Sequence, residues 1–178
     1  MIIRRLAAAL VSAVLLAGVQ LAGAGPATAA PRTLYYDASQ AQEFVAVVDQ
    51  GAQIWNSRVS NVRLVPVPAG RTPNIRVYAD NGWPRTYTTS LGNGRWYMGR
   101  EAVNEGYYPP RIAAHEFGHI LGLPDRRTGL CADLMSGSSA PVSCTNAYPN
   151  AAEIAQVNAN FRTAVALPAQ TYVWRIPA

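Results

Sequence analysis

The first apolar segments beyond residue 30 predict a strand followed by a helix. Residues 34–36 are apolar and precede Asp37, as expected for a short strand that ends at a polar residue. Residues 38–57 then repeat apolar side chains every three or four positions, which indicates an amphipathic helix. One face of this helix would carry Phe44, Val47, Val48, Gly51 and Trp55. Asp37 or Ser39 is expected to cap its start.

The middle of the chain has short segments typical of strands. We expect strands at residues 62–67, 74–78 and 95–100. The stretch 80–94 is polar and lacks a clear period, so a loop is expected there. Asn93-Gly94 at its end is a dipeptide typical of hairpin turns and would lead into the third of these strands.

Two more helices are predicted in the second half of the chain. Residues 111–122 have helical spacing, and Pro110 fits the first helical turn. A long connection rich in glycine, serine and proline follows at residues 125–149. Asn150 and Glu153, three residues apart, predict a capping box at the start of the last helix. Together these elements predict an α+β domain in which three helices accompany a small mixed sheet.

The N-terminal segment has the pattern of a secretory signal peptide. Arg4 and Arg5 precede an apolar stretch, and Ala27-Thr28-Ala29 matches a signal-peptidase site. A membrane anchor is the alternative, but the apolar run is short for a membrane span and a cleavage site follows it. Residues 1–30 are therefore expected to direct export and to be removed, which leaves a secreted, extracellular protein with no membrane attachment.

The rest of the chain is expected to form one domain, residues 31–165, followed by a tail, residues 166–178. The tail contains the apolar sequence Tyr172-Val173-Trp174. Either it packs against the domain or it is loose, and both alternatives stay open. There is no room for a long propeptide before Leu34, so either none is needed or the true start lies upstream. A monomer is the default expectation.

Composition and charge exclude several classes of protein. With 49% hydrophobic and 14% charged residues, the chain is not expected to be disordered. All 15 basic residues are arginines, so a phosphate-binding P-loop, which requires a lysine, is absent. The net charge of +5 comes from scattered arginines, and two of these lie in the signal segment. We therefore expect no nucleic-acid partner.

The two cysteines, Cys131 and Cys144, allow a single pairing. An exported protein encounters an oxidising compartment, so a disulfide is expected, and two free thiols are the alternative. By the chain-entropy model, closing so short a loop stabilises the folded state by about 3 kcal/mol.

The only two histidines of the chain, His115 and His119, are four residues apart on the predicted helix 111–122. Residues at this spacing share one helix face, so both imidazoles can reach one metal ion. Glu116 between them completes the His-Glu-x-x-His pattern of zinc hydrolases. Beyond Gly122, which favours a chain reversal, Asp125 could return as a third ligand and leave the fourth zinc position open. The alternatives are two inert surface histidines, and an Asp125 that caps the helix or pairs with a charge.

The extended motif is similar to the metzincin signature, in which a glycine stands three residues after the second histidine. Metzincins usually have a third histidine, and an aspartate at this place in so small an exported domain resembles the snapalysin family of small neutral metalloproteases. The segments that carry the resemblance are His115-Glu116-Phe117-Gly118-His119-Ile120-Leu121-Gly122-Leu123-Pro124-Asp125, Leu134-Met135-Ser136-Gly137, and residues 143–151 and 52–57. The resemblance covers about residues 33–162.

The resemblance implies a metzincin-like fold and a secreted zinc endopeptidase that acts on proteins or peptides. The zinc site would lie on the second of the three helices, with one catalytic Zn²⁺ held by His115, His119 and Asp125. Glu116 would activate the zinc-bound water. The substrate would lie extended along an edge strand, for which residues 95–99 are the candidate. The resemblance further implies a preference for an aromatic residue just after the cleaved bond.

Three structural features of the family also bear on this sequence. Met135 would be the methionine of the Met-turn, which packs beneath the zinc histidines without binding zinc. Cys131 and Cys144 bracket this turn as the family disulfide does. Family members bind calcium just before the zinc helix through an aspartate and a threonine. Tyr108 and Pro110 stand at the corresponding positions here, so calcium at this place is doubtful, although the sequence leaves it open.

Other functions remain to be weighed against proteolysis. A non-catalytic exported module could keep zinc as a structural element and bind a protein in the same cleft, although such a module has no use for Glu116. A zinc hydrolase that cleaves another substrate, such as a cell-wall peptide, would have the same motif. Ser136 and Ser138 are poor candidates for a nucleophile, because no third histidine is present to act as their base.

Overall fold

The structure is a computed structural model, and it describes residues 30–162 and 168–174. The predicted signal peptide, apart from residue 30, lies outside the described residues. The same holds for residues 163–167 and 175–178.

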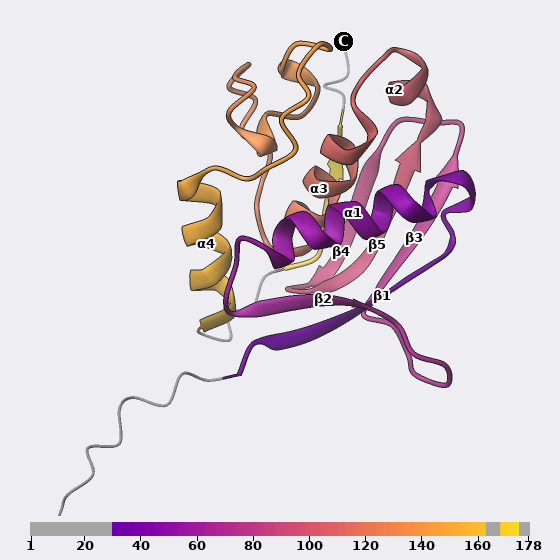
Figure 1. Ribbon diagram of the computed structural model, residues 1–178, viewed down its shortest axis with the longest axis vertical. Coiled ribbons are helices and arrows are strands. Elements are labelled where there is room, and N and C mark those ends of the chain that lie inside the picture. Colours follow the sequence, from indigo (N-terminus) through magenta and orange to yellow (C-terminus); the bar gives the residue numbers. More distant parts are fainter. Residues whose placement is uncertain (1–29, 163–167, 175–178) are drawn as a thin grey trace, which may run out of the picture.

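A single mixed sheet forms one layer of the domain (Figure 1). Its strands are β1 (Arg32–Gln40), β2 (Val62–Pro66), β3 (Ile75–Asp80), β4 (Arg85–Ser90), β5 (Asn93–Gly99) and β6 (Gln170–Val173). Within the described residues their order is β2-β1-β3-β5-β4-β6. The first four strands in this order run parallel, whereas β4 is antiparallel to both β5 and β6.

The helices that matter for the site lie in a second layer on one face of the sheet (Figure 1). They are α1 (Val45–Asn56), α2 (Arg100–Asn104), α3 (Pro109–Ile120) and α4 (Ala151–Arg162), with short 3₁₀ segments η1 (Gln42–Phe44) and η2 (Leu134–Ser139). At the crossing of α1 and α3, a Cβ on Gly51 would lie 2.9 Å from the Cβ of Ala113, so only glycine allows this close approach. The α3 side chain of Phe117 contacts Trp96 of the sheet edge-to-face, and both are fully buried.

The α+β class is confirmed, and so are the three long helices, which appear as α1, α3 and α4. The capping box of α4 is also confirmed. The backbone N–H of Glu153 donates to Asn150 Oδ1 at 2.9 Å, and the backbone N–H of Asn150 donates to Glu153 Oε2 at 2.7 Å. Strands β2, β3 and β5 lie where strands were expected, within one or two residues at their ends.

The start of the first helix was predicted wrongly. Strand β1 extends to Gln40, and α1 begins only at Val45 with no side-chain cap. Asp37 instead accepts a hydrogen bond from the backbone N–H of Ser39 within the strand. The parallel partners β2 and β3 on either side of β1 supply backbone hydrogen bonds that extend the strand beyond its apolar residues.

The polar stretch 80–94 is not a loop, because β4 lies within it. The turn falls at Leu91-Gly92, where Gly92 has φ +81°, and Asn93 already pairs with Ser90 in the hairpin. Thr86 and Thr88 face inward here, so the usual apolar alternation of a strand is replaced by buried hydroxyls. Segment α2 and strand β6 were not predicted either.

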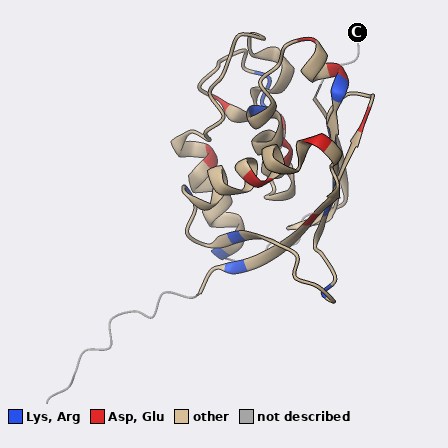
Figure 2. Cartoon of the chain, turned by 45° about the vertical axis from the view of Figure 1, so that its right-hand side comes forward, with Lys and Arg blue, Asp and Glu red and all other residues tan. Residues whose placement is uncertain are grey.

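Charged residues are dispersed over the elements in the described part of the chain (Figure 2). Among the described residues, no helix is both long enough and apolar enough to cross a membrane.

Candidate metal centre

The two histidines of α3 present the same ring nitrogen to each other. Their Nε2 atoms are 3.0 Å apart. The Nδ1 atom of His115 lies 3.0 Å from the carbonyl oxygen of Leu134, and that of His119 lies 2.8 Å from the carbonyl oxygen of Leu123. Because a carbonyl only accepts, each Nδ1 must carry the proton, so each Nε2 is left with a lone pair. Two lone pairs that face each other favour a shared cation between them.

Asp125 returns to these histidines after the chain reverses. Gly122 has φ +90°, a conformation that glycine adopts without strain, and this turn ends α3. The Oδ1 atom of Asp125 then lies 3.4 Å from His115 Nε2 and 3.7 Å from His119 Nε2. The other oxygen, Oδ2, pairs with Arg127 at 3.0 Å. The carboxylate therefore makes the charge pair considered as an alternative and also faces the two imidazoles.

Glu116 lies beside this cluster and is fully buried. Its Oε2 accepts a hydrogen bond from the hydroxyl of Thr86 on β4 at 2.6 Å. Its Oε1 has no hydrogen-bond partner among the described residues. Burial raises the pKa of Glu116 to about 7, against the opposing effects of His115 and Thr86. A carboxylate whose pKa lies near neutrality is suited to take up and return a proton.

The electrostatics of the ligand candidates favour metal binding. Burial, together with the neighbouring His115, lowers the pKa of His119 to about 3, so its imidazole is neutral at neutral pH. Burial alone would raise the pKa of Asp125, but His115, His119 and Arg127 outweigh it and hold that pKa below its usual value. Neutral imidazoles and an ionised carboxylate are the protonation states in which these side chains bind zinc.

These residues fit a zinc ion by their donor set and by their unsatisfied atoms. Ligand atoms of His115, His119 and Asp125 all lie within 4.8 Å of one another. Asp125 Oδ1 and Glu116 Oε1 are buried without a hydrogen-bond partner among the described residues. Two imidazole nitrogens and one carboxylate oxygen form a known catalytic zinc set, with a fourth position for water or substrate.

Met135 lies directly beneath the helix that carries the histidines. It is fully buried, and a Cβ on Gly118 would lie 2.6 Å from its sulfur. Gly118, which lies between His115 and His119 in the sequence, therefore leaves the space that the methionine fills. Because the carbonyl of the preceding residue, Leu134, accepts from His115, this turn also orients one imidazole.

Three interactions hold the turn of Met135 in place. The buried carboxylate of Glu153 accepts hydrogen bonds from the backbone N–H groups of Leu134 and Met135. The guanidinium of Arg111, inside α3, donates to the carbonyl oxygens of residues 131, 133 and 146. The disulfide Cys131–Cys144 closes the loop, as expected.

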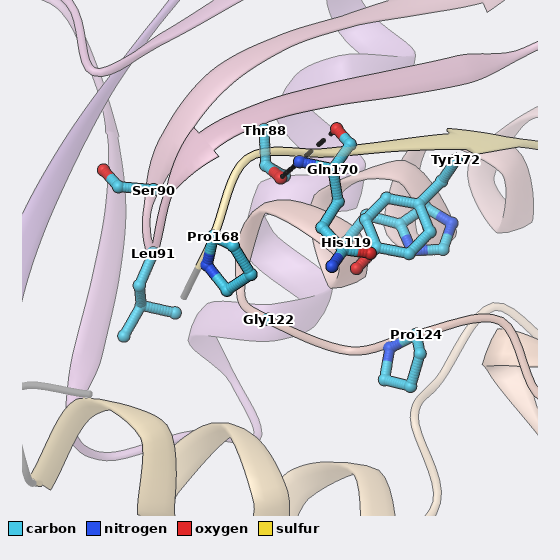
Figure 3. Close-up of a pocket in the computed structure, with 9 residues that line it drawn as sticks. All are labelled: Thr88, Ser90, Leu91, His119, Gly122, Pro124, Pro168, Gln170 and Tyr172. Atoms are coloured by element: carbon cyan, nitrogen blue, oxygen red, sulfur yellow. Dashed lines mark hydrogen bonds between the residues drawn. The ribbon is translucent and has the colours of Figure 1, made fainter. Parts of the chain in front are cut away.

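Strand β6 lies beside His119, and Figure 3 shows the ring of Tyr172 stacked against this histidine. The ring of Tyr172 stacks on His119 with centroids 4.0 Å apart, and the ring of Trp174 contacts His115 edge-to-face at 4.6 Å. A cavity of about 230 Å³ lies next to His119, and Pro168, Gln170 and Tyr172 form part of its wall.

Comparison with known proteins identifies a matching family. The family described as Streptomyces extracellular neutral proteinase (M7) matches residues 31–164. The chain belongs to this family. It is the family that the sequence motifs resemble, so that prediction is confirmed.

Three relatives are named extracellular small neutral protease. The protein of Streptomyces sp. strain C5 is 46% identical over 128 residues, which are 71% of this chain and 55% of that protein. The protein of Streptomyces lividans is 42% identical over 127 residues, again 71% of this chain and 55% of that protein. This chain therefore spans about half the length of these two relatives. The protein of Streptomyces caespitosus is 44% identical over 128 residues, which are 71% of this chain and 95% of that protein. These relatives are named as extracellular proteins, in agreement with the predicted extracellular location.

The candidate substrate strand was placed wrongly. Residues 95–99 belong to β5, which lies inside the sheet between β3 and β4. Trp96 and Met98 are fully buried in the core. The strand that contacts the candidate site is β4, whose Thr86 donates a hydrogen bond to Glu116.

Several residues around the centre were not found from the sequence. Thr86 contacts Glu116, and Arg127 contacts Asp125. Tyr172 contacts His119, and Trp174 contacts His115. Arg127 follows Asp125 by two residues, which is the only local signal for its role. Tyr172 and Trp174 stand out in the sequence, but their position depends on the pairing of β6 with β4, where the polar pattern of residues 80–94 predicts a loop.

Proposed function

We propose that this M7 family member is a secreted zinc-dependent endopeptidase that hydrolyses peptide bonds in proteins. The observation that carries the proposal is the convergence of His115, His119 and Asp125 beside the buried carboxylate of Glu116. When bound, zinc would polarise the peptide carbonyl and acidify the attacking water. The proposal includes the domain limits 31–165, with residues 1–30 as a signal peptide.

Each residue of the centre has a separate task in this mechanism. The carbonyls of Leu134 and Leu123 fix the proton on Nδ1 of each histidine, so both Nε2 atoms would be available to hold zinc. Glu116 removes a proton from the attacking water and later delivers it to the leaving amine. Thr86 holds one oxygen of Glu116, which leaves the partnerless Oε1 to receive that proton. Met135 supports the helix from below and is not a ligand.

The substrate is proposed to lie extended along β4, with an aromatic residue just after the cleaved bond. Thr86 of β4 contacts Glu116, so a chain that paired with β4 in the place taken by β6 would lie beside the candidate zinc site. The space beside His115 takes a large aromatic ring, since Trp174 is fully buried there against His115 and Tyr107. This supports an aromatic preference on the side of the cleft near His115.

The test is hydrolysis of a denatured protein by residues 31–178 with the disulfide oxidised. We expect cleavage that stops with a zinc chelator, returns when zinc is restored, and is lost in Glu116→Ala although this variant still binds zinc. Mass spectrometry of the products should show aromatic residues enriched just after the cut bonds. Glu105→Gln, an exposed carboxyl at the end of α2, is the matched control and should cleave normally.

Two results would contradict the proposal. Full activity in Glu116→Ala would remove the general-base role, and activity that survives complete removal of zinc would remove the metal. If the folded, zinc-loaded protein cuts no protein substrate, the alternatives are a zinc-stabilised binding module or a hydrolase of another substrate, such as a cell-wall peptide. A panel of such peptides separates these two alternatives.

A further inference from the structure

The last described segment of the chain forms an additional strand at the edge of the active-site cleft. Strand β6 pairs antiparallel with β4, from Gln170 opposite Thr88 to Val173 opposite Arg85. Beyond the strand, the backbone N–H of Trp174 donates to the carbonyl oxygen of Pro84 at 2.9 Å. The tail therefore takes up the hydrogen-bonding edge of β4 from Arg85 to Thr88, and this is the edge that an extended peptide would need.

The side chains of this strand lie directly on the metal cluster. Tyr172 stacks nearly parallel on the ring of His119, at an interplanar angle of 3°. Trp174, which follows the strand, contacts the rings of both His115 and Tyr107 edge-to-face and is fully buried. In Figure 1 the yellow strand lies close to α3, in agreement with these contacts. Both histidines are therefore covered by aromatic rings from the tail.

Polar groups beside the cluster bind the backbone of the tail. Arg127 donates through one nitrogen to the carbonyl oxygen of Val173 and through another to that of Trp174. The hydroxyl of Ser138 also donates to the carbonyl oxygen of Trp174, at 2.7 Å. The same guanidinium pairs with Asp125. Arg127 thus binds the backbone carbonyls of the tail and also contacts Asp125, a candidate zinc ligand. The same contacts would position the backbone of a bound peptide.

We propose that residues 170–174 are a tethered competitor that fills the peptide-binding cleft and must leave before a substrate can enter. The inference rests on the proposed function, because it identifies the β4 edge with the substrate site. Arg127 and Ser138 are then the groups that bind the backbone of any peptide in this cleft, whether tail or substrate. Trp174 is the anchor of the tail, since its ring is the most deeply buried side chain of the segment.

The contacts of the tail also explain how it can leave. The side chains of Gln170, Thr171 and Val173 are exposed, so the segment is held by its backbone and by its two aromatic rings. The indole Nε1 of Trp174 has no hydrogen-bond partner among the described residues, so release exposes this donor to water instead of breaking a bond. A free peptide of similar sequence can replace a strand held in this way, provided that its concentration competes with the effective concentration of the tethered tail.

The first experiment measures peptide binding in the absence of zinc, so no hydrolysis is needed. The probe is a fluorescein-labelled peptide with the sequence of residues 168–174, and its anisotropy is followed on metal-free protein. We compare the chain 31–178, a chain that ends at residue 167, Trp174→Ala in the full chain, and Thr171→Ala as the matched control on the same strand. Circular dichroism and thermal melting verify that each variant is folded.

We expect the shortened chain and Trp174→Ala to bind the peptide at least about tenfold more tightly than the full chain. A tenfold ratio corresponds to a cleft that the tail closes nine-tenths of the time. Thr171→Ala should bind as weakly as the full chain, because its side chain is exposed. Equal affinity in all four proteins, or no binding to any folded variant, would overturn the proposal. Trp174→Ala supplies the answer if the shortened chain does not fold.

A second measurement separates this proposal from the proposed function. With zinc present, a tethered competitor raises KM for an unrelated peptide and leaves kcat unchanged, so removal of the tail should lower KM alone. If the peptide binds as expected but no variant hydrolyses a substrate, the proposed function fails and the tail proposal stands. If hydrolysis is observed with the same KM in the presence and absence of the tail, the tail proposal fails and the proposed function stands.

Discussion

Replacement of Glu153 by alanine should destabilise the whole domain, although this residue lies outside the metal centre. Its buried carboxylate accepts three backbone hydrogen bonds, from Leu134, Met135 and Asn150. One of these belongs to the capping box of α4, and the other two hold the turn beneath the histidines. Glu153 therefore connects the last helix to the turn that orients His115.

The size of the effect follows from the groups left without a partner. Leu134 and Met135 are fully buried, so each orphaned N–H costs about 1.5 kcal/mol. Loss of the helix cap adds about 1 kcal/mol. The total, about 4 kcal/mol, is a large share of the 5–15 kcal/mol typical of a folded domain. For a domain of this size it corresponds to a fall in melting temperature of roughly 12 °C.

Urea denaturation and thermal melting followed by circular dichroism measure this change. The disulfide must be oxidised in every sample, so that loop closure is the same throughout. Glu153→Gln should lose less stability than Glu153→Ala, because an amide oxygen in the place of Oε2 still accepts the bonds from Leu134 and Asn150. Glu105→Gln, at an exposed position, is the control and should have the same melting temperature as the wild-type protein. If Glu153→Ala melts within 2 °C of the unchanged protein, the turn does not depend on this carboxylate and the reasoning is wrong.

Three further predictions concern the turn and the metal. Gly118→Ala gains about 1 kcal/mol of helix propensity but forces the sulfur of Met135 to move, so we expect a net loss of about 1 kcal/mol in urea denaturation, and increased stability would contradict this. Replacement of both Cys131 and Cys144 by serine should cost about 3 kcal/mol by the same method, and an unchanged midpoint would refute it. Zinc at a hundred times its Kd should stabilise the wild-type protein by about 2.7 kcal/mol. The same zinc concentration should stabilise the Asp125→Ala variant much less. If zinc raises the melting temperature equally in both proteins, Asp125 is not a ligand.

The convergence of the candidate zinc ligands was predictable because these residues are close in sequence. His115, Glu116 and His119 lie on one helix, where the residue spacing alone sets their geometry. Asp125 follows within one short turn, and Gly122 signals that turn. A local pattern of this kind does not depend on the rest of the fold. The capping box at Asn150 was predictable for the same reason.

The residues around the centre were not predictable in this way because distant segments bring them together. Thr86 reaches Glu116 only because β4 forms the hairpin with β5. The buried hydroxyl residues of β4 give this strand a polar sequence that is typical of a loop. Tyr172 and Trp174 reach the histidines only through the pairing of β6 with β4. Strand register depends on the partner strand, so no pattern within residues 170–174 could identify the contact.

The edge of β4 connects the proposed substrate site with the tail that occupies it. A protease cleft built on a sheet edge must leave backbone N–H and C=O groups free, and such an edge accepts any extended chain that reaches it. Here the aromatic tail is joined to the domain and has rings that fit the two histidines, so it meets the edge at a higher effective concentration than a free peptide does. The feature that would allow a substrate to bind therefore also allows the chain to occupy its own cleft. The affinity of the tail for that edge then decides how much of the protein is open to substrate.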